Sequence, residues 1–228
     1  MNKLKDLCLN GFQLKLIGWA CTLCGVAAIL FFPMTSMGIL KVILTYIGYI
    51  ALPIFAFLLV EGFALTENLS RYALLLGICA LVTEPFYDFV CTGHWLDTAS
   101  GSGQNIFFAM LLGLLQLRFV HYMGTGSLVR KIACGSMVFA TALWTTYLNI
   151  PYGFYFEMMV GIFYLLHDNE KWMFWITGVI SAFSMGTPAL GILAILAYDG
   201  ERGSYNKYLF YAAFPLIWIV MALIRLLV

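Results

Sequence analysis

Charged residues are scarce in this 228-residue chain, and long stretches of it contain none. Asp, Glu, Lys and Arg make up 10% of the residues, whereas 63% are hydrophobic. This composition leaves too little polar surface to cover a soluble globule. No charged residue occurs in 42–60, 132–156, 172–198 or 208–224, and a bilayer core of ~30 Å needs ~20 mostly apolar residues of helix. The sequence therefore predicts an all-α fold, a polytopic transmembrane helical bundle.

Further absences exclude several classes of function. The formal net charge of +1 provides no broad basic surface, so we expect no nucleic-acid partner. The sequence has no phosphate-binding loop, no H-E-x-x-H and no nucleophile elbow. Cys21 and Cys24 form a C-x-x-C pair within an apolar segment, where helix packing is the better interpretation, and we expect no metal site. No polar stretch is long enough for a soluble domain, so 1–228 is expected to be one domain within the lipid bilayer.

About eight spans are expected, because eight apolar segments alternate with polar or turn-forming residues. They are 14–32, 42–62, 71–90, 104–121, 131–149, 152–167, 172–197 and 208–227. Cytoplasmic loops of membrane proteins carry an excess of Lys and Arg. With the N-terminus inside, the inner side holds Lys3, Lys5, Lys15, Arg71, Arg118, Arg130, Lys131, Lys171 and Arg225, and the outer side holds Lys41, Arg202 and Lys207. This bias predicts both termini in the cytoplasm.

Ionisable residues inside a membrane are costly and therefore mark hypotheses of function. Glu61 ends the second expected span, and Glu84 lies in the third with Asp88 one helical turn later. Asn105 opens the fourth span, so Glu84 and Asn105 are expected to face a common polar cavity near the outer side. His94 lies in the adjoining loop and is a second candidate base. The alternative for each residue is a polar group near an interface or paired with a neighbouring helix.

A second polar cluster lies between the last two expected spans. Arg202 is flanked there by Asp199 and Glu201, and glycines at 200 and 203 permit a tight turn. A guanidinium between two carboxylates can clamp an anionic group. An ordinary solvated loop is the alternative.

Blocks of sequence along nearly the whole chain share the pattern of one family. They are 47–63, Thr66 with Asn68, Tyr72 with Leu74, 84–85, 105–108, 111–115, 152–155, 198–203 and 207–211 before Pro215. The blocks around Glu61 and Arg202 are the most specific. With these blocks, the chain resembles the TraX family of integral membrane proteins, whose named member acetylates the N-terminus of F-pilin during conjugation.

The resemblance implies an acyltransferase of the bacterial inner membrane that uses acyl-CoA, such as acetyl-CoA. The acceptor would be an amine or hydroxyl of a pilin-like or other peptide, or of another envelope component. The catalytic residues would be Glu84 or His94 as base, with Asn105 hydrogen-bonding the acyl carbonyl or the acceptor. The substrate-binding residues would be Glu61, Asp88, Asp199, Glu201 and Arg202. Arg130 and Lys131 would meet the phosphates of the donor.

Two positions depart from the family's pattern. The family usually carries Asp-His in the first span, where this chain has Gly25 and Val26, and a histidine in the last span, where it has Ile217. A general base contributes roughly 10²–10⁴-fold, so we expect no strong transfer by the usual histidine route. A non-catalytic membrane partner or scaffold is the alternative. A small-solute transporter is a third interpretation, less favoured because no internal repeat is visible.

Overall fold

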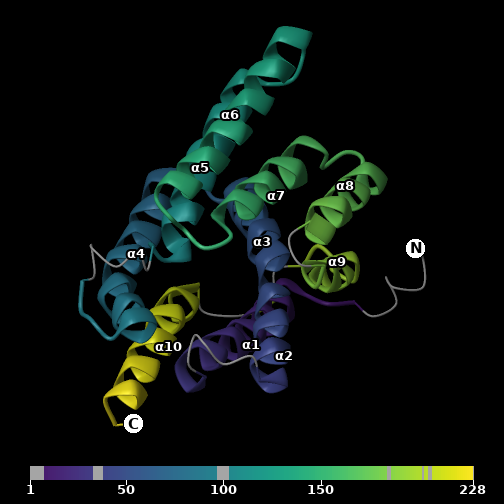
Figure 1. Ribbon diagram of the computed structural model, residues 1–228. Helices are drawn as coiled ribbons and strands as arrows, with labels where there is room; N and C mark the ends of the chain where they lie inside the picture. Colours follow the sequence, from purple (N-terminus) through teal and green to yellow (C-terminus); the bar gives the residue numbers. More distant parts are fainter. Residues whose placement is uncertain are drawn as a thin grey trace.

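Helices make up nearly all of the chain that can be described. The computed structural model describes residues 8–32, 38–96, 103–183, 186–201, 203–204 and 207–227. The helices are α1 (Gly11–Phe31), α2 (Ile39–Tyr49), α3 (Ala51–Leu65), α4 (Leu69–Thr92), α5 (Ile106–Met123), α6 (Leu128–Tyr147), α7 (Gly153–Leu165), α8 (Glu170–Phe183), α9 (Pro188–Leu196) and α10 (Lys207–Leu227). Figure 1 shows α5 and α6 projecting from the rest of the bundle. The predicted helical bundle is confirmed.

Four stretches of helix are long and apolar enough to cross a membrane within the described residues. They are Gly11–Phe31, Ile39–Leu65, Leu69–Thr92 and Ile106–Met123, with shorter apolar helices at Gly153–Leu165 and Tyr211–Leu227. Large apolar side chains also cover the outside, where Leu74 is 64% exposed and Leu81 is 70% exposed. An exposed apolar surface of this kind is suited to lipid. The protein is therefore a membrane protein.

The expected span 42–62 is one crossing made of two helices. Helix α2 ends at Tyr49 and α3 begins at Ala51, with Ile50 between them. Pro53 lacks the N–H that would bond the Tyr49 carbonyl, so the helical ladder is interrupted at this point. The backbone of α9 approaches the break closely, because a Cβ on Gly191 would lie 2.4 Å from the Ile50 carbonyl oxygen. Helix α9 therefore packs directly against the break between α2 and α3.

The bundle has two ends, which we call the near end, where α1 begins, and the far end, where α1 finishes. Phe63, close to the end of α3, contacts His121 of α5 and Tyr164 of α7, which places the ends of these three helices together. Helix α3 reaches the near end, because Glu61 is hydrogen-bonded to Tyr198, which pairs with Leu9. Helix α4 starts directly after α3 and therefore runs from the near end to the far end.

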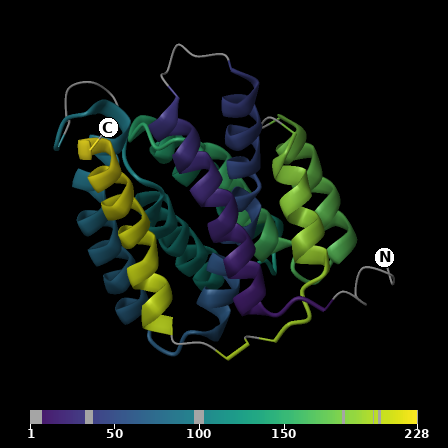
Figure 2. The same cartoon turned by 90° about the horizontal axis from the view of Figure 1, so that it is seen from below.

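The expected span 172–197 is wrong, because this segment forms two short antiparallel helices. Helices of 14 and 9 residues are about 21 Å and about 14 Å long, which is less than the ~30 Å of a bilayer core. Lys171 at the start of α8 and Leu196 at the end of α9 line the same groove. Gly186 turns the chain with a φ of 81°, and Pro188 opens α9. The segment therefore enters the bundle from the near end and returns to it, and Figure 2 shows its two helices side by side.

This hairpin changes the side on which the following residues lie. The Gly11 amide donates to the Glu201 carbonyl over 2.7 Å, and the Asp199 amide donates to the Leu9 carbonyl over 3.1 Å. The loop with Asp199 and Glu201 is therefore at the near end, and its expected place on the side opposite the N-terminus is wrong. Arg202 lies outside the described residues.

The end of the chain also lies on the side opposite to the one expected. Helix α10 runs parallel to α4, because Tyr211 contacts Tyr72 while Arg225 donates to the Val90 carbonyl. Figure 2 shows α10 beside α1 and running in the same sense. The described chain therefore begins at the near end and finishes at the far end, so the prediction that both termini share the cytoplasmic side is wrong. The prediction counts an even number of membrane crossings. The α8–α9 hairpin replaces one of these crossings, so α10 ends on the opposite side.

Most basic side chains still lie at one end. Among the described residues, the near end holds Lys15, Arg71, Arg118, Arg130, Lys131 and Lys171, and the far end holds Lys41 and Arg225. An excess of Lys and Arg on short loops marks the cytoplasmic side. The distribution therefore predicts that the near end faces the cytoplasm.

Cysteine labelling tests this topology. In a variant without the native cysteines, single cysteines at Asp168 and Asp199 should be labelled from the same side, because α8 and α9 enter and leave at the near end. A cysteine at His94 should be labelled from the opposite side. The measurement is modification by a membrane-impermeant maleimide in intact and in permeabilised cells. Labelling of positions 168 and 199 from opposite sides would mean that the segment crosses the membrane completely.

Candidate functional site

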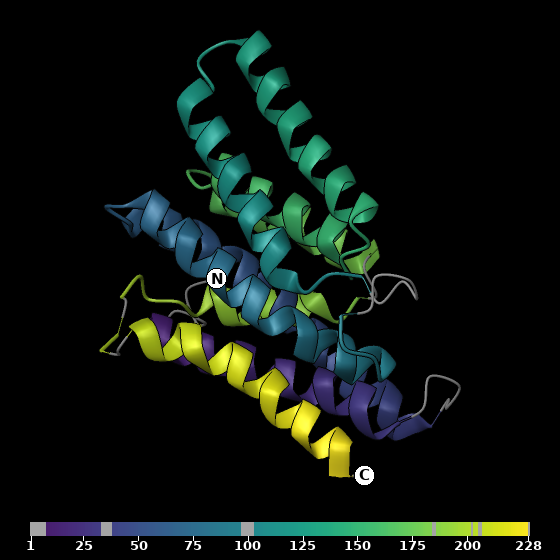
Figure 3. The same cartoon turned by 90° about the vertical axis from the view of Figure 1, so that its left-hand side faces the viewer.

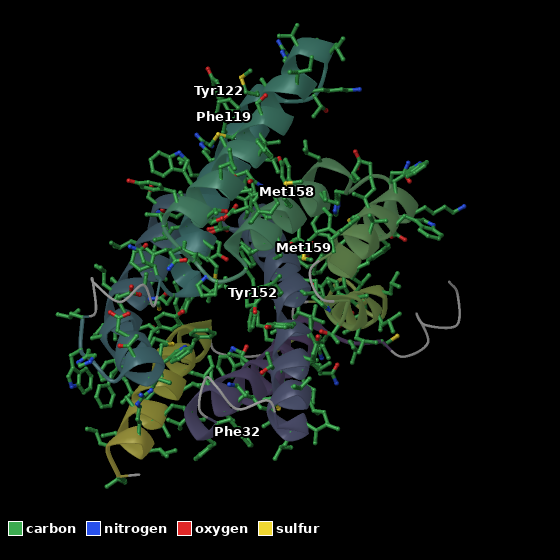
Figure 4. All side chains as sticks on the ribbon, viewed as in Figure 1. Phe32, Phe119, Tyr122, Tyr152, Met158 and Met159 are labelled. Atoms are coloured by element: carbon green, nitrogen blue, oxygen red, sulfur yellow. The ribbon has the colours of Figure 1, made fainter. Side chains whose placement is uncertain are left out.

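A cavity of about 780 Å³ lies inside the bundle towards the far end. Its apolar walls come from α1, α3, α7 and α10, and include Val26, Phe55, Phe156 and Phe214. Its polar lining includes Lys41, Tyr49, Asn105, Tyr152 and Arg225. Figure 4 labels Tyr152 near the centre of the bundle. Cavities of this size, mostly apolar with a few polar groups, are typical of small-molecule sites.

One wall of the cavity depends on a backbone contact between α1 and α2. A Cβ on Gly48 would lie 2.8 Å from the Cα of Gly25, and a Cβ on Gly25 would lie 3.2 Å from the Cα of Gly48. The two helices can come this close only because neither residue has a side chain. Gly25 occupies the position where the TraX pattern has Asp, and an Asp side chain would collide with α2. Val26, at the histidine position, is 3% exposed and lines the cavity.

Two tyrosines from distant parts of the chain meet in the cavity. The hydroxyls of Tyr49 and Tyr152 are hydrogen-bonded to each other, and their ring centroids are 4.6 Å apart. Tyr152 precedes α7 with a φ of 60°, a left-handed conformation that a bulky residue rarely adopts. Backbone strain of this kind persists where the surroundings hold a residue in place, often at functional sites. The pair joins the α2–α3 break to the start of α7.

Glu84 and Asn105 are in direct contact, but of the two only Asn105 lines the cavity that they were expected to share. Asn105 donates from its backbone N to Glu84 Oε2 over 3.1 Å and from Nδ2 to the same oxygen over 2.5 Å. The amide also donates to the Ala80 carbonyl and accepts from the Phe107 amide, so it caps α5 while bonding α4. Asn105 is 1% exposed and lines the cavity, and Glu84 lies behind it. The cavity therefore ends at the Asn105 amide, and the Glu84 carboxyl group lies beyond it.

Asp88 and His94, the other residues predicted near the outer side, do not line the cavity. Asp88 is 4% exposed on the same helix as Glu84. His94 is exposed after the end of α4 at Gly93, and its backbone amide donates to Thr92 Oγ1 over 3.2 Å. His94 is not among the residues lining the cavity. Glu84 and Asn105 therefore lie together, whereas His94 lies beyond the end of α4.

The remaining predicted site residues lie at the near end, away from the cavity. Glu61 is hydrogen-bonded to Tyr198 with His167 nearby. Asp199 and Glu201 are exposed, and the Glu201 amide donates to Asp199 Oδ1 over 2.7 Å. Arg130 and Lys131 are exposed in the first turn of α6. Glu61, Asp199 and Glu201, and the predicted donor-binding residues Arg130 and Lys131, therefore lie apart from Asn105, whereas Asp88 lies on α4 with Glu84.

A buried polar cluster between α5, α6 and α7 forms a separate feature. Glu157 is 0% exposed, and its carboxyl accepts from the backbone amide of Gly113. With its amide nitrogen facing that carboxyl, Gln116 donates to Glu157 Oε2 over 3.3 Å and to Thr141 over 2.5 Å. Polar groups in a membrane interior commonly join helices in this way. None of the three residues lines the cavity.

Sequence reasoning missed several residues of the cavity. In the sequence, Lys41 and Arg225 contribute only to the distribution of charge that predicts orientation, and no pattern marks Trp218. Tyr152 belongs to one of the family-like blocks, but nothing in the sequence pairs it with Tyr49. Among the described residues, no group of three or more His, Cys, Asp or Glu could hold a metal ion.

Replacing Asn105 tests its place in the structure. We expect Asn105→Ala to lower the free energy of unfolding by about 1 kcal/mol for the lost helix cap, and by a further ~1–3 kcal/mol because buried polar groups lose a partner. Asn68→Ala is the matched control, because Asn68 caps α4 at an exposed position by accepting from the Arg71 amide. Thermal unfolding in detergent measures both. Equal losses would show that the bonds to Glu84 and Ala80 contribute nothing.

Comparison with known proteins agrees with the sequence blocks and with the fold. The sequence model of one family, described as TraX protein, matches residues 13–225. No curated protein and no solved structure matches the chain. Because the match runs from the first turn of α1 to the last turn of α10, it includes every helix that lines the cavity. The chain belongs to the TraX family.

Proposed function

We propose that this protein is a membrane acyltransferase, which moves an acyl group from acyl-CoA to an amine or hydroxyl of a peptide or envelope acceptor. The cavity towards the far end is the proposed site of transfer. The observation that carries the proposal is the place of two family-typical segments. Positions 25 and 26 of α1 line this cavity, and so do positions 214 and 218 of α10, whereas Ile217 between them is not among the lining residues. The segments that hold the acid and base of the resembled family therefore meet at one site.

Glu84 is the proposed base, and Asn105 positions it. The Asn105 amide lies between Glu84 and the cavity. Its backbone nitrogen and its side-chain nitrogen both donate to Glu84 Oε2. That geometry fixes the direction of the carboxyl group towards the cavity wall. A proton leaving the acceptor passes beside the Asn105 amide to reach Glu84. The hydroxyl pair of Tyr49 and Tyr152 supplies a donor for the oxygen that becomes negative during acyl transfer.

The donor is proposed to be acyl-CoA, with acetyl-CoA as the first choice. Lys41 and Arg225 line the cavity, whereas Arg130 and Lys131 lie at the near end. In this proposal Arg130 and Lys131 collect the donor phosphates at the cytoplasmic surface, as the sequence predicts. A pilin-like peptide with a free N-terminal amine is the proposed acceptor, and the bacterial inner membrane is the proposed location.

A substitution at Glu84 tests the assignment of the base. Glu84→Gln keeps an oxygen for Asn105 but removes basicity, so we expect transfer of labelled acetyl groups from acetyl-CoA to amine-bearing peptides to fall roughly 10²–10⁴-fold. Glu157→Gln is the matched control, because Glu157 is a buried carboxyl group that bonds Gly113 and Gln116 and not the cavity-lining Asn105. His94→Ala forms a third arm. Loss of transfer in His94→Ala alone would move the base to His94, and transfer unaffected by either change would contradict both assignments.

A ligand-binding protein without catalysis is the second candidate. Among the described residues that line the cavity, none is Asp, Glu or His. A site without its own base can bind a ligand and still leave it unchanged. A ligand-binding function requires the cavity but requires no base and no acyl transfer.

A gain of function separates the two candidates. Val26→His places an imidazole at the cavity wall, so in a transferase that lacks its usual base we expect the rate to rise by roughly 10²-fold. Val26→Leu controls for the added volume, since extra atoms in a packed site typically cost about 1–3 kcal/mol. The same acetyl-transfer assay measures both variants. Absence of transfer in the wild type and in Val26→His would favour the ligand-binding protein.

A further inference from the structure

A half-buried arginine in the last turn of α10 lines the cavity. An ionisable side chain within a membrane protein is costly, and it is usually paired or functional. We propose that Arg225 binds an acidic side chain of the acceptor, and that the acceptor is a peptide with this acid roughly three or four residues beyond its reacting N-terminal amine. The inference rests on the proposed acyl transfer and adds the class of peptide that the site selects.

The contacts of Arg225 hold its guanidinium in place but do not neutralise it. Nη1 donates to the Val90 carbonyl, and the guanidinium carbon lies 6.0 Å from the Phe89 ring centroid. Neither group is an anion, and the structure gives Arg225 no ion pair with a described residue. The carboxyl groups of Glu84 and Asp88 on α4 lie outside the lining of the cavity. A guanidinium has several N–H donors in a fixed fork, which matches a carboxylate, so Arg225 is suited to an acid that the ligand brings.

The cavity is long enough to hold several residues of an extended peptide. Phe214 and Arg225 both line it from α10, and the helix between them is about 16 Å long. Lys41 and Tyr49 both line it from α2, over about 12 Å of helix. An extended chain advances ~3.3–3.6 Å per residue. The cavity therefore has room for about four extended residues.

The cavity opens at the far end of the bundle. Phe31, at the end of α1, lines the cavity and is 54% exposed. Figures 2 and 3 show α10 running beside α1 towards this end. The distribution of Lys and Arg predicts that the far end lies away from the cytoplasm. A peptide outside the cytoplasm therefore reaches the cavity directly, while the proposed donor-binding residues Arg130 and Lys131 lie at the near end.

The spacing along α4 determines where the acid lies in the peptide. The Asn105 amide bonds Glu84 Oε2 and the Ala80 carbonyl, whereas the guanidinium of Arg225 bonds the Val90 carbonyl. Val90 follows Glu84 by about 9 Å of helix and follows Ala80 by about 15 Å. An extended chain covers this separation in roughly three or four residues. With the N-terminal amine at Asn105, the acid at Arg225 therefore belongs to the fourth residue of the peptide or to one of its neighbours.

The walls between these two points favour apolar residues in the peptide before the acid. Phe55, Phe156 and Phe214 line the cavity together with Val26. A charged side chain facing these rings would lose its hydration without gaining a partner. The acceptor class is therefore a peptide with small or apolar first residues followed by Asp or Glu.

A series of acceptor peptides tests the position of the acid on the purified full-length protein in detergent. Short peptides of Ala and Ser carry a single Glu, which is moved stepwise from the second residue to the eighth, and Gln replaces Glu in the matched peptides. The measurements are kcat and KM for each peptide with labelled acetyl-CoA as donor. We expect Glu at the third to fifth residue to lower KM roughly tenfold relative to Gln, since a hydrogen bond to a charged group and a tenfold change in affinity are of similar size. Equal KM values for Glu and Gln peptides, or a benefit that is independent of position, would overturn the proposal.

Substitutions at Arg225 separate recognition of the acid from a purely structural role. We expect Arg225→Gln to raise KM for the acidic peptide to the value of its Gln counterpart, with KM for acetyl-CoA unchanged. Arg225→Lys keeps the charge and should retain part of the preference. Arg118→Gln is the matched control, because Arg118 is exposed and does not line the cavity. Loss of the contacts between α10 and α4 alone would lower transfer to acidic and neutral peptides equally, and a rise in KM for acetyl-CoA alone would assign Arg225 to the donor; either result would contradict the inference.

Binding of the same peptides, measured by native mass spectrometry, keeps this inference distinct from the proposed function. Transfer that does not discriminate between Glu and Gln peptides would leave the acyltransferase standing and reject the acidic acceptor. Preferential binding of the acidic peptide that depends on Arg225, without transfer to any peptide, would retain the ligand class and contradict the acyltransferase. If Arg225→Gln fails to fold, the position series and Arg225→Lys decide the result.

Discussion

The contact of Gly25 with Gly48 is the constraint on which the rest of the far end depends. It brings the backbones of α1 and α2 together, which leaves the cavity bounded by α1 and α2 on one side and by α4, α7 and α10 on the others. In a bilayer, close packing of small residues contributes much of the attraction between helices. Position 25, which is Asp in the resembled family, is here a glycine that lets α1 pack against α2. A return to Asp at position 25 would push α2 away and change the cavity itself.

The polar groups among the described lining residues of this cavity include cations and hydroxyls but no carboxylate. Its lining offers the Tyr49–Tyr152 pair and two cations, while the Glu84 carboxyl group lies behind Asn105. Buried polar groups need partners, and Asn105 meets this need for Glu84 from inside the fold. Among the donors of the lining, Arg225 also bonds the Val90 carbonyl, and one tyrosine hydroxyl donates to the other. The lining is therefore rich in donors and cations and contains no carboxylate among its described residues.

The sequence predicts the helical bundle and its membrane character because both depend on local composition. It also places Glu84 and Asn105 on neighbouring spans, although only Asn105 lines the cavity that the two were expected to share. It does not predict the α8–α9 hairpin, because a run of apolar residues from 172 to 198 has the same mean hydropathy whether it crosses the membrane or turns back. The signals of the turn were present in Gly186 and Pro188. The meeting of Tyr49 with Tyr152, by contrast, depends on how α7 packs against the α2–α3 break, and no local pattern records it.

The hairpin also determines which side of the membrane the last helix reaches. Because α8 and α9 return to the near end, α10 starts there and runs parallel to α4, which brings Arg225 to Val90 and into the cavity. With a complete crossing at 172–197, the same arginine would end on the cytoplasmic side, where the count of basic residues had placed it. The structure instead separates Arg225 from the other cations and sets it beside Lys41 in a site of otherwise apolar and donor groups. At the far end Arg225 no longer adds to the cytoplasmic excess of basic residues. Its contacts with the Val90 carbonyl and the Phe89 ring instead tie the end of α10 to α4.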